Sequence, residues 1–576
     1  MIKLFNKTFL TFLLLQFLII FLSTTAWAMD LKLKIDPLAE PLIKNNTAVG
    51  LIIGIVRDGE TQILAYGEKT KGTNVSPDGE TLFEIGSVSK VFTGILLADM
   101  VEKGIVKLED PVQEYLPEGV SMPVYDGKII TLEHLATHTS GLPRLPDNLA
   151  LSDLTNPYAE YSEAQIYEFL NGYKLIRPPG KYEYSNFGMG LLGHLLARKA
   201  GKSYEQCITD QICKPAGMTD TFIGLDEDRK TRMATPYNTA LNQVSVWDFT
   251  DLAGCGGIRS NANDMINFIK ANLNNDNSPF TRAVKISHIK RHDINKGGVS
   301  IGLGWHIIPE IGLCHDGGTG GFCTWISILP EKQTGIFMMT NTGNLGLLQL
   351  GPKIMRVALG LETAAPESRT EVDVSPDLLK SYENTYKVEI TNTLLSISFE
   401  NDRLMAVIPV LGRLQLFAES NTDFFIKAAD IQISFVTDKD GKTDHLILHA
   451  GGQDLKAFPV KVIKVRPDVL ESYTGIYSLA PDVNITVTAD NNKLMAQATG
   501  QGKIPFYPES ETEFFCKLVD ARIIFKPDQE GKIDHMILRQ GGIDQTVKRK
   551  GDVIRKKPDE EGKVNHIILH HGGLDL

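Results

Sequence analysis

The last third of the chain repeats itself, and this repeat limits the possible folds more than any other feature. SPDLLKSYENTY, from Ser375, matches RPDVLESYTGIY, from Arg466, at an offset of 91 residues. DGKTDHLILHAGG, from Asp440, matches EGKIDHMILRQGG, from Glu530, at an offset of 90. A third fragment, KPDEEGKVNHIILHHGG from Lys557, repeats only the end of a unit. Two units are too few for a solenoid, so each unit is expected to bury its own core.

The pattern inside a unit is that of antiparallel strands. Ile485, Val487 and Ala489 alternate with polar residues, which is the period of a half-buried strand. Asp490–Asn492 and Asp528–Gly531 are typical of hairpin turns. We therefore expect small all-β domains, each a barrel or a sandwich, and a terminal remnant: repeat unit 1 at residues 376–465, repeat unit 2 at 466–550 and a partial repeat hairpin at 551–576. The repeat histidines are better explained by shared packing than by metal binding: His445, His535 and His566.

The polar stretch LETAAPESRTEVDVSP, from Leu361, contains two prolines, and residues 362–375 within it are predicted to be a linker. Before it, strand-like runs such as VGLIIGIV alternate with helix-like runs, which indicates an α/β (α+β) domain at residues 29–361.

The first 28 residues have the features of a secretory signal peptide. Lys3 and Lys7 are followed by an apolar run, Phe9–Leu22, and then by Ala26 and Ala28 at the −3 and −1 positions of a cleavage site. The alternative is an uncleaved anchor, but the run is short for a span of ~20 residues. We expect cleavage and export to the periplasm or the extracellular space.

Charge and cysteine content exclude several classes of function. The 59 Lys and Arg against 70 Asp and Glu give a formal net charge of −11, so a nucleic-acid partner is not expected. Six cysteines are too few for a disulfide scaffold, and the absence of CxxC argues against a zinc module. They fall into two possible disulfides and two expected buried thiols: Cys314 with Cys323, Cys207 with Cys213, and Cys255 and Cys516.

The segment FEIGSVSKVFTGILL predicts a buried helix that begins near Ser87. Ser87 and Lys90 are three residues apart and share one face of its first turn. A serine needs a base to become a nucleophile, and a lysine can be that base when burial lowers its pKa. SxxK alone is a weak signal, because Ser287 and Lys290 match it too, without an apolar helix behind them.

Two further motifs are weak alone and informative together. Tyr184 and Asn186 lie in YSN, where a tyrosine could share a proton with the lysine and an amide could bind a substrate amide. His315 and Gly317 lie in LCHDGGTGGF, whose glycines allow a substrate to approach a strand edge.

In this order, the three motifs resemble those of the penicillin-recognising serine hydrolases, and the class C β-lactamase-like branch in particular. LATHTSGLPRLP, from Leu135, and AGCGGIRSNANDMINFI, from Ala253, also resemble that branch. The resemblance covers roughly residues 30–360. It implies a sandwich of a helical region and an antiparallel sheet of five or more strands.

The resemblance also implies the role of each residue. Ser87 is acylated, while Lys90 and Tyr184 handle its proton. Asn186 and His315 bind substrate, and the backbone N–H groups of Ser87 and Gly318, beside Gly317, form the oxyanion hole. Water then hydrolyses the acyl-enzyme, and neither a metal nor an organic cofactor is needed.

The third motif departs from the class C β-lactamases, which have Lys-Thr-Gly where this chain has His-Asp-Gly. A histidine is mostly neutral at pH 7, so it holds a substrate carboxylate less well than a lysine. This fits the peptidases, D-aminopeptidases and esterases of the branch better. We expect a D,D-carboxypeptidase, endopeptidase or D-aminopeptidase that acts on cell-wall-type peptides, with weak β-lactam hydrolysis. The alternatives are an esterase with the same machinery and a non-catalytic cell-wall-binding protein. The expected partners are a small peptide, β-lactam or ester substrate, and peptidoglycan is a candidate.

Overall fold

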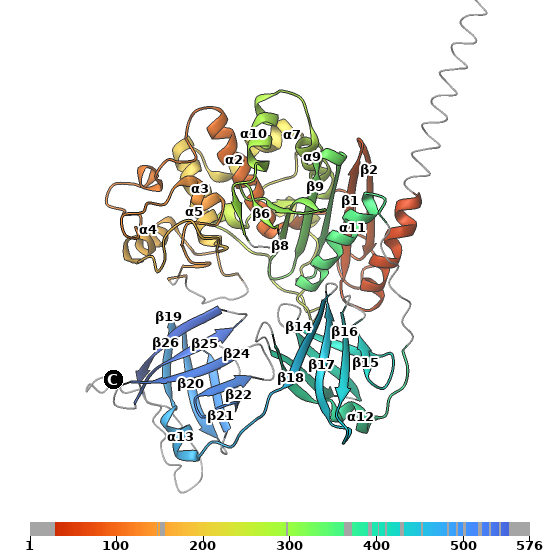
Figure 1. Ribbon diagram of the computed structural model, residues 1–576. Coiled ribbons are helices and arrows are strands. Elements are labelled where there is room, and N and C mark those ends of the chain that lie inside the picture. Colours follow the sequence, from red (N-terminus) through yellow and green to blue (C-terminus); the bar gives the residue numbers. More distant parts are fainter. Residues whose placement is uncertain are drawn as a thin grey trace, which may run out of the picture. The chain divides into compact units, whose positions relative to one another are not determined.

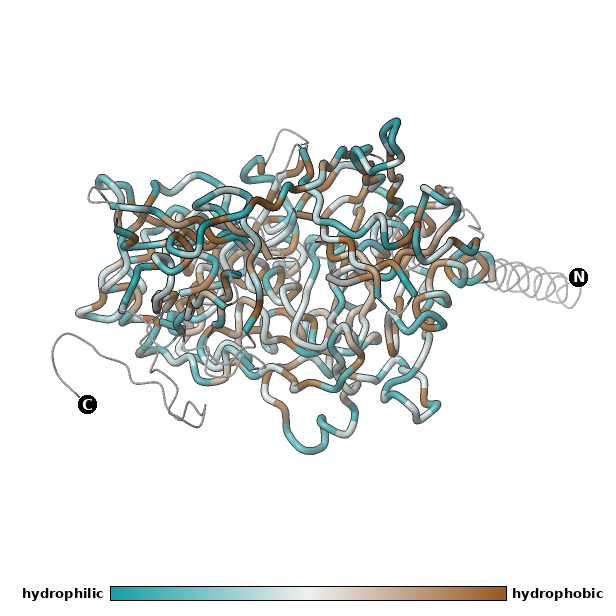
Figure 2. The backbone as a smooth tube through the Cα atoms, turned by 90° about the horizontal axis from the view of Figure 1, so that it is seen from below, coloured by the Kyte–Doolittle hydropathy of each residue, from teal (hydrophilic) through white to brown (hydrophobic). Residues whose placement is uncertain are grey.

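The computed structural model describes residues 29–551 except for residues 147, 150–155, 295–297, 362–370, 390–393, 401, 409–411, 427–430, 451–452, 481–482, 491–492, 499–502, 517–520, 529–531 and 541–542. The expected signal peptide, most of the linker and all but the first residue of the terminal hairpin therefore lie outside the described residues. The chain divides into two compact units between residues 367 and 368. Figure 1 shows the elements of each unit, and in Figure 2 many of the peripheral loops are hydrophilic.

An eight-stranded antiparallel sheet organises the first unit, in the order β2-β1-β10-β9-β8-β7-β6-β5. Its strands are β1 (Gly50–Arg57), β2 (Glu60–Gly67), β5 (His292–Asp293), β6 (Ser300–Ile301), β7 (His306–Ile308), β8 (Gly312–Gly318), β9 (Cys323–Leu329) and β10 (Thr334–Thr340). A small separate sheet pairs β3 (Phe83–Glu84) with β4 (Arg259–Ser260).

Apolar side chains cover both faces of the large sheet. In β1, Ile52 belongs to the core under the helical region, whereas Ile53 belongs to the core on the opposite face. Residues 29–44, which are helical, and α11 (Leu350–Ala358) contribute to that second core. Because β1 is buried on both faces, its sequence is continuously apolar rather than alternating.

The helical region lies between β3 and β5 in the sequence. Its helices are α2 (Ser89–Glu102), α3 (Leu132–Ala136), α4 (Glu163–Gly172), α5 (Asn186–Ala200), α6 (Tyr204–Ile208), α7 (Lys214–Ala216), α8 (Glu227–Arg232), α9 (Ala262–Leu273) and α10 (Pro279–His288). Short 3₁₀ or π turns are η1 (Gly86–Val88), η2 (Val112–Tyr115), η3 (Thr209–Cys213), η4 (Ala253–Cys255), η5 (Pro330–Lys332) and η6 (Leu345–Gln349). Every residue of α2 from Ser89 to Met100 is buried, so this helix is the centre of the region. The expected sandwich of sheet and helices is confirmed.

Each repeat begins with a short helix and continues as a closed eight-stranded antiparallel barrel. Of the two folds expected for a repeat, the barrel is therefore the one observed. The first contains α12 (Pro376–Ser381), β11 (Asn384–Val388), β12 (Leu394–Glu400), β13 (Arg403–Ile408), β14 (Gly412–Ala418), β15 (Asp423–Phe425), β16 (Ile431–Thr437), β17 (Thr443–Ala450) and β18 (Gln453–Pro459). The second contains α13 (Pro467–Ser472), β19 (Gly475–Ala480), β20 (Val483–Asp490), β21 (Lys493–Ala498), β22 (Ile504–Pro508), β23 (Glu513–Cys516), β24 (Ala521–Pro527), β25 (Ile533–Gln540) and β26 (Ile543–Gly551).

The repeated Ser-Tyr dipeptide has a structural explanation. Tyr382 stacks on Phe435 in the first barrel, with ring centroids 4.0 Å apart, and its hydroxyl donates to a backbone carbonyl. Tyr473 stacks on Phe525 in the same way in the second, at 4.1 Å. Each tyrosine therefore attaches the segment after the short helix to the barrel core.

Both proposed disulfides are absent, and all six cysteines, each within the described residues, are buried free thiols. In the β8–β9 register Cys314 lies opposite Ser327, and Cys323 lies opposite Gly318, so the two thiols are not cross-strand partners. Cys207 and Cys213 follow one another along α6 and η3 at a spacing of six residues, which does not place two side chains on one helical face.

The repeat histidines that are described each lie beside an acidic neighbour. Nδ1 of His445 lies 2.8 Å from Asp444, and Nδ1 of His535 lies 2.6 Å from Asp534, while His566 is outside the described residues. Within the described ranges no group of three or more His, Cys, Asp or Glu side chains is placed to hold a metal ion. In that same part of the chain, no helix has the length and apolar character that crossing a membrane requires.

Candidate active site

Ser87 lies in the single 3₁₀ turn η1, which continues directly into α2. Its side chain is half-buried, whereas most of its neighbours in the sequence are fully buried. The helix predicted to begin near Ser87 is therefore present, and its first turn is a tight one. The turn requires Gly86 in the left-handed region, at φ +50°, which favours glycine.

Lys90 is fully buried and points back at Ser87. Its Nζ donates to Ser87 Oγ at 2.8 Å and to the Cys255 carbonyl at 2.6 Å. Burial lowers the pKa of Lys90 to about 8, and the nearby Arg144 guanidinium also acts to lower it. A lysine with this pKa is partly neutral near neutral pH, so it can accept the proton of the serine hydroxyl.

Tyr184 completes a cluster with the serine and the lysine. Lys90 Nζ lies 4.8 Å from the centroid of the Tyr184 ring. Burial raises the pKa of Tyr184 well above its usual value, while a hydrogen bond to Ser87 acts in the opposite direction. The phenol is therefore protonated at rest and suited to pass a proton between the serine and a leaving group.

A loop after α3 fixes the segment that carries Tyr184. The N–H of Ser185 donates to His138 Nδ1 at 3.1 Å, and its hydroxyl donates to the Pro143 carbonyl at 2.6 Å. The N–H of Asn186 donates to the Arg144 carbonyl at 3.0 Å. These three bonds explain why LATHTSGLPRLP accompanies the YSN motif: it positions the backbone at the start of α5.

Asn186 is the first residue of α5 and lies beside a tyrosine. Its Nδ2 donates to the Tyr158 hydroxyl at 3.1 Å. Its Oδ1 is buried and has no hydrogen-bond partner among the described residues. A buried acceptor without a partner is costly, so this oxygen is available to a substrate N–H.

The end of β8 lies directly against the turn that carries Ser87. A Cβ on Gly317 would lie 2.1 Å from the Ile85 carbonyl oxygen and 3.1 Å from the Ser87 nitrogen. A Cβ on Gly86 would lie 2.7 Å from the Gly318 nitrogen. Only glycines allow this approach, and it brings the backbone amides of Ser87 and Gly318 into the same small region.

His315 is 1% exposed and is not a charged group in this site. Burial lowers its pKa well below the usual value, and the neighbouring His306 and Lys90 act in the same direction. Its ring centroid lies 5.0 Å from that of His306 and 6.2 Å from that of Tyr184. Nε2 is buried without a hydrogen-bond partner among the described residues, so it can contact a bound molecule as a neutral group.

The structure therefore brings together residues from all three motifs and separates the second SxxK sequence from them. Ser287 is buried in α10 and donates to the Val284 carbonyl, whereas Lys290 is exposed and pairs with Asp293. α10 ends at His288, so Ser287 and Lys290 do not share a helical face.

Four groups of the site have no role predicted from the sequence: His138, Arg144, the Cys255 carbonyl and His306. His138 and Arg144 lie inside LATHTSGLPRLP, and Cys255 lies inside AGCGGIRSNANDMINFI. Both segments resemble the family, but the resemblance gave no function to these three residues. His306 lies on β7, and its Nε2 is 3.0 Å from the Tyr182 hydroxyl. A single histidine in a strand belongs to no motif, so the sequence did not indicate that it lies in the site.

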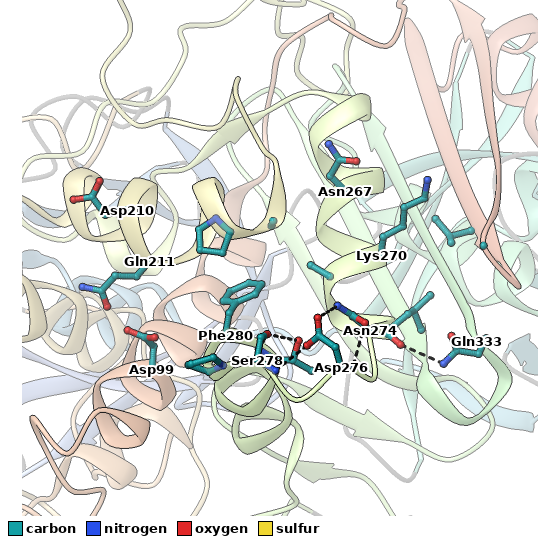
Figure 3. Close-up of a pocket in the computed structure, with 18 of the residues that line it drawn as sticks. Asp99, Asp210, Gln211, Asn267, Lys270, Asn274, Asp276, Ser278, Phe280 and Gln333 are labelled. Atoms are coloured by element: carbon teal, nitrogen blue, oxygen red, sulfur yellow. Dashed lines mark hydrogen bonds between the residues drawn. The ribbon is translucent and has the colours of Figure 1, made fainter.

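A separate hollow of about 890 Å³ lies near the other end of α2 (Figure 3). Asp99, Asp210, Lys270 and Phe280 are among the residues that line it, and no residue of the three motifs is. Asp99 follows Ser87 by twelve residues, or about 18 Å along a helix. Two acidic side chains that line the hollow already form ion pairs: Asp99 pairs with Lys103, and Asp210 pairs with two lysines. This hollow has no arrangement for acyl transfer.

Comparisons with known proteins agree with this geometry. The family model described as Beta-lactamase matches residues 35–355, and Domain of unknown function (DUF3471) matches residues 460–553. The chain is 29% identical over 335 residues to the D-alanyl-D-alanine-carboxypeptidase/endopeptidase AmpH of Escherichia coli strain K12, covering 54% of this chain and 84% of that protein. It is 27% identical over 352 residues to a beta-lactamase of Pseudomonas fluorescens, covering 54% of this chain and 94% of that protein.

A solved structure is also similar to this chain. The beta-lactamase/D-alanine carboxypeptidase from Yersinia pestis, complexed with citrate, is 28% identical, with a TM-score of 0.53. The match covers 58% of this chain and 99% of that one. The Beta-lactamase family model, over residues 35–355, includes all three motifs.

Proposed function

Since the chain belongs to the beta-lactamase family of serine hydrolases, we propose that it cleaves D-amino-acid peptides of cell-wall type through an acyl-enzyme on Ser87. The action would be that of a D,D-carboxypeptidase, an endopeptidase or a D-aminopeptidase, with weak β-lactam hydrolysis. The observation that carries the proposal is the 2.8 Å contact between Ser87 Oγ and the buried Nζ of Lys90. The relatives named as D-alanine carboxypeptidases support the substrate class.

The proposed reaction has two halves. Lys90, in its neutral form, and Tyr184 take the proton of Ser87 as its oxygen attacks the scissile carbonyl. The N–H groups of Ser87 and Gly318 stabilise the oxyanion, and one such donor typically contributes ~3 kcal/mol to the transition state. Tyr184 protonates the leaving amine, and water then hydrolyses the ester on Ser87 with the same groups acting in reverse.

The residues in place of Lys-Thr-Gly favour a peptidase over an efficient β-lactamase. A neutral His315 does not offer the permanent charge that a lysine gives to a substrate carboxylate. An esterase with the same machinery is the second candidate, because ester hydrolysis needs only Ser87, Lys90 and Tyr184. A non-catalytic wall-binding role is disfavoured, because a binding protein gains nothing from burying a lysine beside a serine.

Labelling with a fluorescent penicillin or a fluorophosphonate tests the nucleophile. The wild-type protein should be labelled, Ser87→Ala should not be, and Ser287→Ala should behave as the wild type. Turnover should fall at least ~10³-fold in Ser87→Ala. Labelling that persists in Ser87→Ala would disprove the assignment, and rates on D-Ala-D-Ala peptides against p-nitrophenyl esters would separate the peptidase from the esterase.

We also propose that the protein acts after export, in the periplasm or outside the cell, where peptidoglycan is found. The two barrels would then serve substrate access, wall attachment or assembly. Binding of the full chain to isolated peptidoglycan, compared with binding of a chain that ends near Leu361, tests the wall-attachment role.

A further inference from the structure

We propose that Arg144 binds a carboxylate of the substrate, so that the site selects anionic peptides over their neutral analogues. This inference rests on the proposed function, because it names the substrate class and a specificity-determining residue of the same site. It assigns to the loop after α3 a second role beyond holding the start of α5.

The other basic groups of the site cannot supply a charge to a substrate carboxylate. Lys90 is 0% exposed, and its Nζ is already occupied by Ser87 and the Cys255 carbonyl. His138 accepts a hydrogen bond from the Ser185 N–H at Nδ1, so Nδ1 is unprotonated and the ring is neutral. His315 is fully buried beside two other basic side chains, and burial also lowers the pKa of His306, so both rings favour the neutral form.

Arg144 differs from these groups in being exposed and unpaired. The residue is exposed, and its Cζ lies 5.1 Å from the centroid of the Tyr184 ring. Among the described residues no ion pair involves it, whereas the nearby Arg177 pairs with Glu183. Its guanidinium can therefore make the bidentate contact that a carboxylate favours.

The backbone of Arg144 is held although its side chain is free. Its carbonyl accepts from the N–H of Asn186 at 3.0 Å and from the N–H of Phe187 at 3.2 Å. The base of the side chain is thus fixed relative to Tyr184, which must reach the leaving group. A cation fixed beside the proton donor can recognise a carboxylate a few bonds from the reacting amide.

Arg144 has an alternative role that the test must separate from substrate binding. Its charge lowers the pKa of Tyr184, while the half-buried Asp316 raises it. If Arg144 acted only through Tyr184, its removal would slow every substrate equally. If it binds a carboxylate, its removal slows only the substrates that carry one.

Two matched pairs of peptides provide the test. In the first pair, a peptide that ends in D-Ala-D-Ala has a free C-terminal carboxylate or a C-terminal amide. In the second, both peptides end in the amide, and an upstream lysine is succinylated, which places a carboxylate on the acyl side, or acetylated. kcat/KM is measured for the wild type, Arg144→Gln, Arg144→Lys and the control Lys181→Gln, which removes one exposed charge near Tyr184 in sequence.

We expect the wild type to prefer the anionic member of at least one pair by about tenfold or more, the effect of one charge-assisted hydrogen bond. Arg144→Gln should lose this preference mainly through KM, Arg144→Lys should retain part of it, and Lys181→Gln should retain all of it. The pair in which the preference disappears identifies which side of the scissile bond Arg144 contacts.

An equal loss on charged and neutral peptides in Arg144→Gln, or a wild type without preference in either pair, would overturn the inference. Protection of Ser87 from fluorophosphonate by the same four peptides measures their affinity even where turnover is slow. A wild-type protein that the fluorophosphonate does not label would instead overturn the proposed function, so the two failures are distinguishable.

Discussion

Replacing Lys90 by methionine should abolish acylation and at the same time stabilise the first unit. Lys90 is fully buried, and its pKa is about 8 in the folded protein against an ordinary 10.5. At pH 7 the folded state must hold an ammonium group that the unfolded chain keeps in water. A difference of about 2.5 pKa units corresponds to about 3 kcal/mol. Lys90→Met also loses the hydrogen bond to the Cys255 carbonyl, which offsets about 1 kcal/mol of this stabilisation. The free energy of unfolding should therefore rise by about 2 kcal/mol.

The gain should depend on pH in a direction that the pKa values fix. Between pH 8 and 10.5 the unfolded chain binds a proton at Lys90 that the folded chain does not, so the wild type becomes more stable as the pH rises. Lys90→Met lacks this group. Its advantage should therefore be full well below pH 8, shrink above it, vanish at about pH 9.5 and reverse by about 1 kcal/mol near pH 10.5.

Urea unfolding followed by tryptophan fluorescence measures the difference in the free energy of unfolding between Lys90→Met and the wild type, and it reports on the first compact unit alone. The chain has four tryptophans, Trp27, Trp247, Trp305 and Trp325, and all precede the boundary at residues 367 and 368. The barrels therefore do not contribute to the signal. Lys270→Met, on the exposed side of α9, is the control and should change the free energy of unfolding by less than about 0.5 kcal/mol. A Lys90→Met protein that is less stable at pH 7, or whose advantage does not change with pH, would refute the reasoning.

Three other results are expected. If neutral Lys90 is the base, as we propose, the acylation rate of Ser87 on an uncharged substrate should rise about tenfold per pH unit and level off above about pH 8; a flat profile in stopped-flow acylation from pH 6 to 9 would contradict this. Gly317→Ala should slow acylation ~10²-fold by pushing β8 from η1, while Gly172→Ala, whose Cβ meets nothing within 4 Å, should acylate at the wild-type rate. A chain that ends near Leu361 should fold by circular dichroism and still be labelled at Ser87; a folded but unlabelled chain would mean that the barrels complete the site.

The sequence predicted the parts of the fold that depend on local patterns. The buried helix after Ser87 follows from apolar spacing alone, and the two small all-β units follow from alternation and from the repeat. The disulfides could not be predicted from spacing, because the pairing of Cys314 and Cys323 depends on the β8–β9 register. The same limit applies to the choice between a barrel and a sandwich, since closure depends on which strands meet at the ends of the sheet.

The chemistry of the site depends on contacts between distant parts of the chain. Burial lowers the pKa of Lys90, and its Nζ is held by the carbonyl of Cys255, which is 165 residues away. The position of Tyr184 depends on a loop about 40 residues earlier, through His138 and Pro143. The motifs indicated which residues we propose to react, but not how their charges are balanced.

That balance gives a physical reason for a histidine at position 315. The side chain there is buried beside His306 and close to Lys90. A lysine in its place would add a second buried ammonium, and repulsion between the two would lower the pKa of Lys90 further. A neutral histidine avoids this cost but cannot hold a carboxylate by charge. On our proposal the charge that recognises substrate is carried instead by Arg144, whose exposed guanidinium remains in water and so does not incur the desolvation cost of a buried cation.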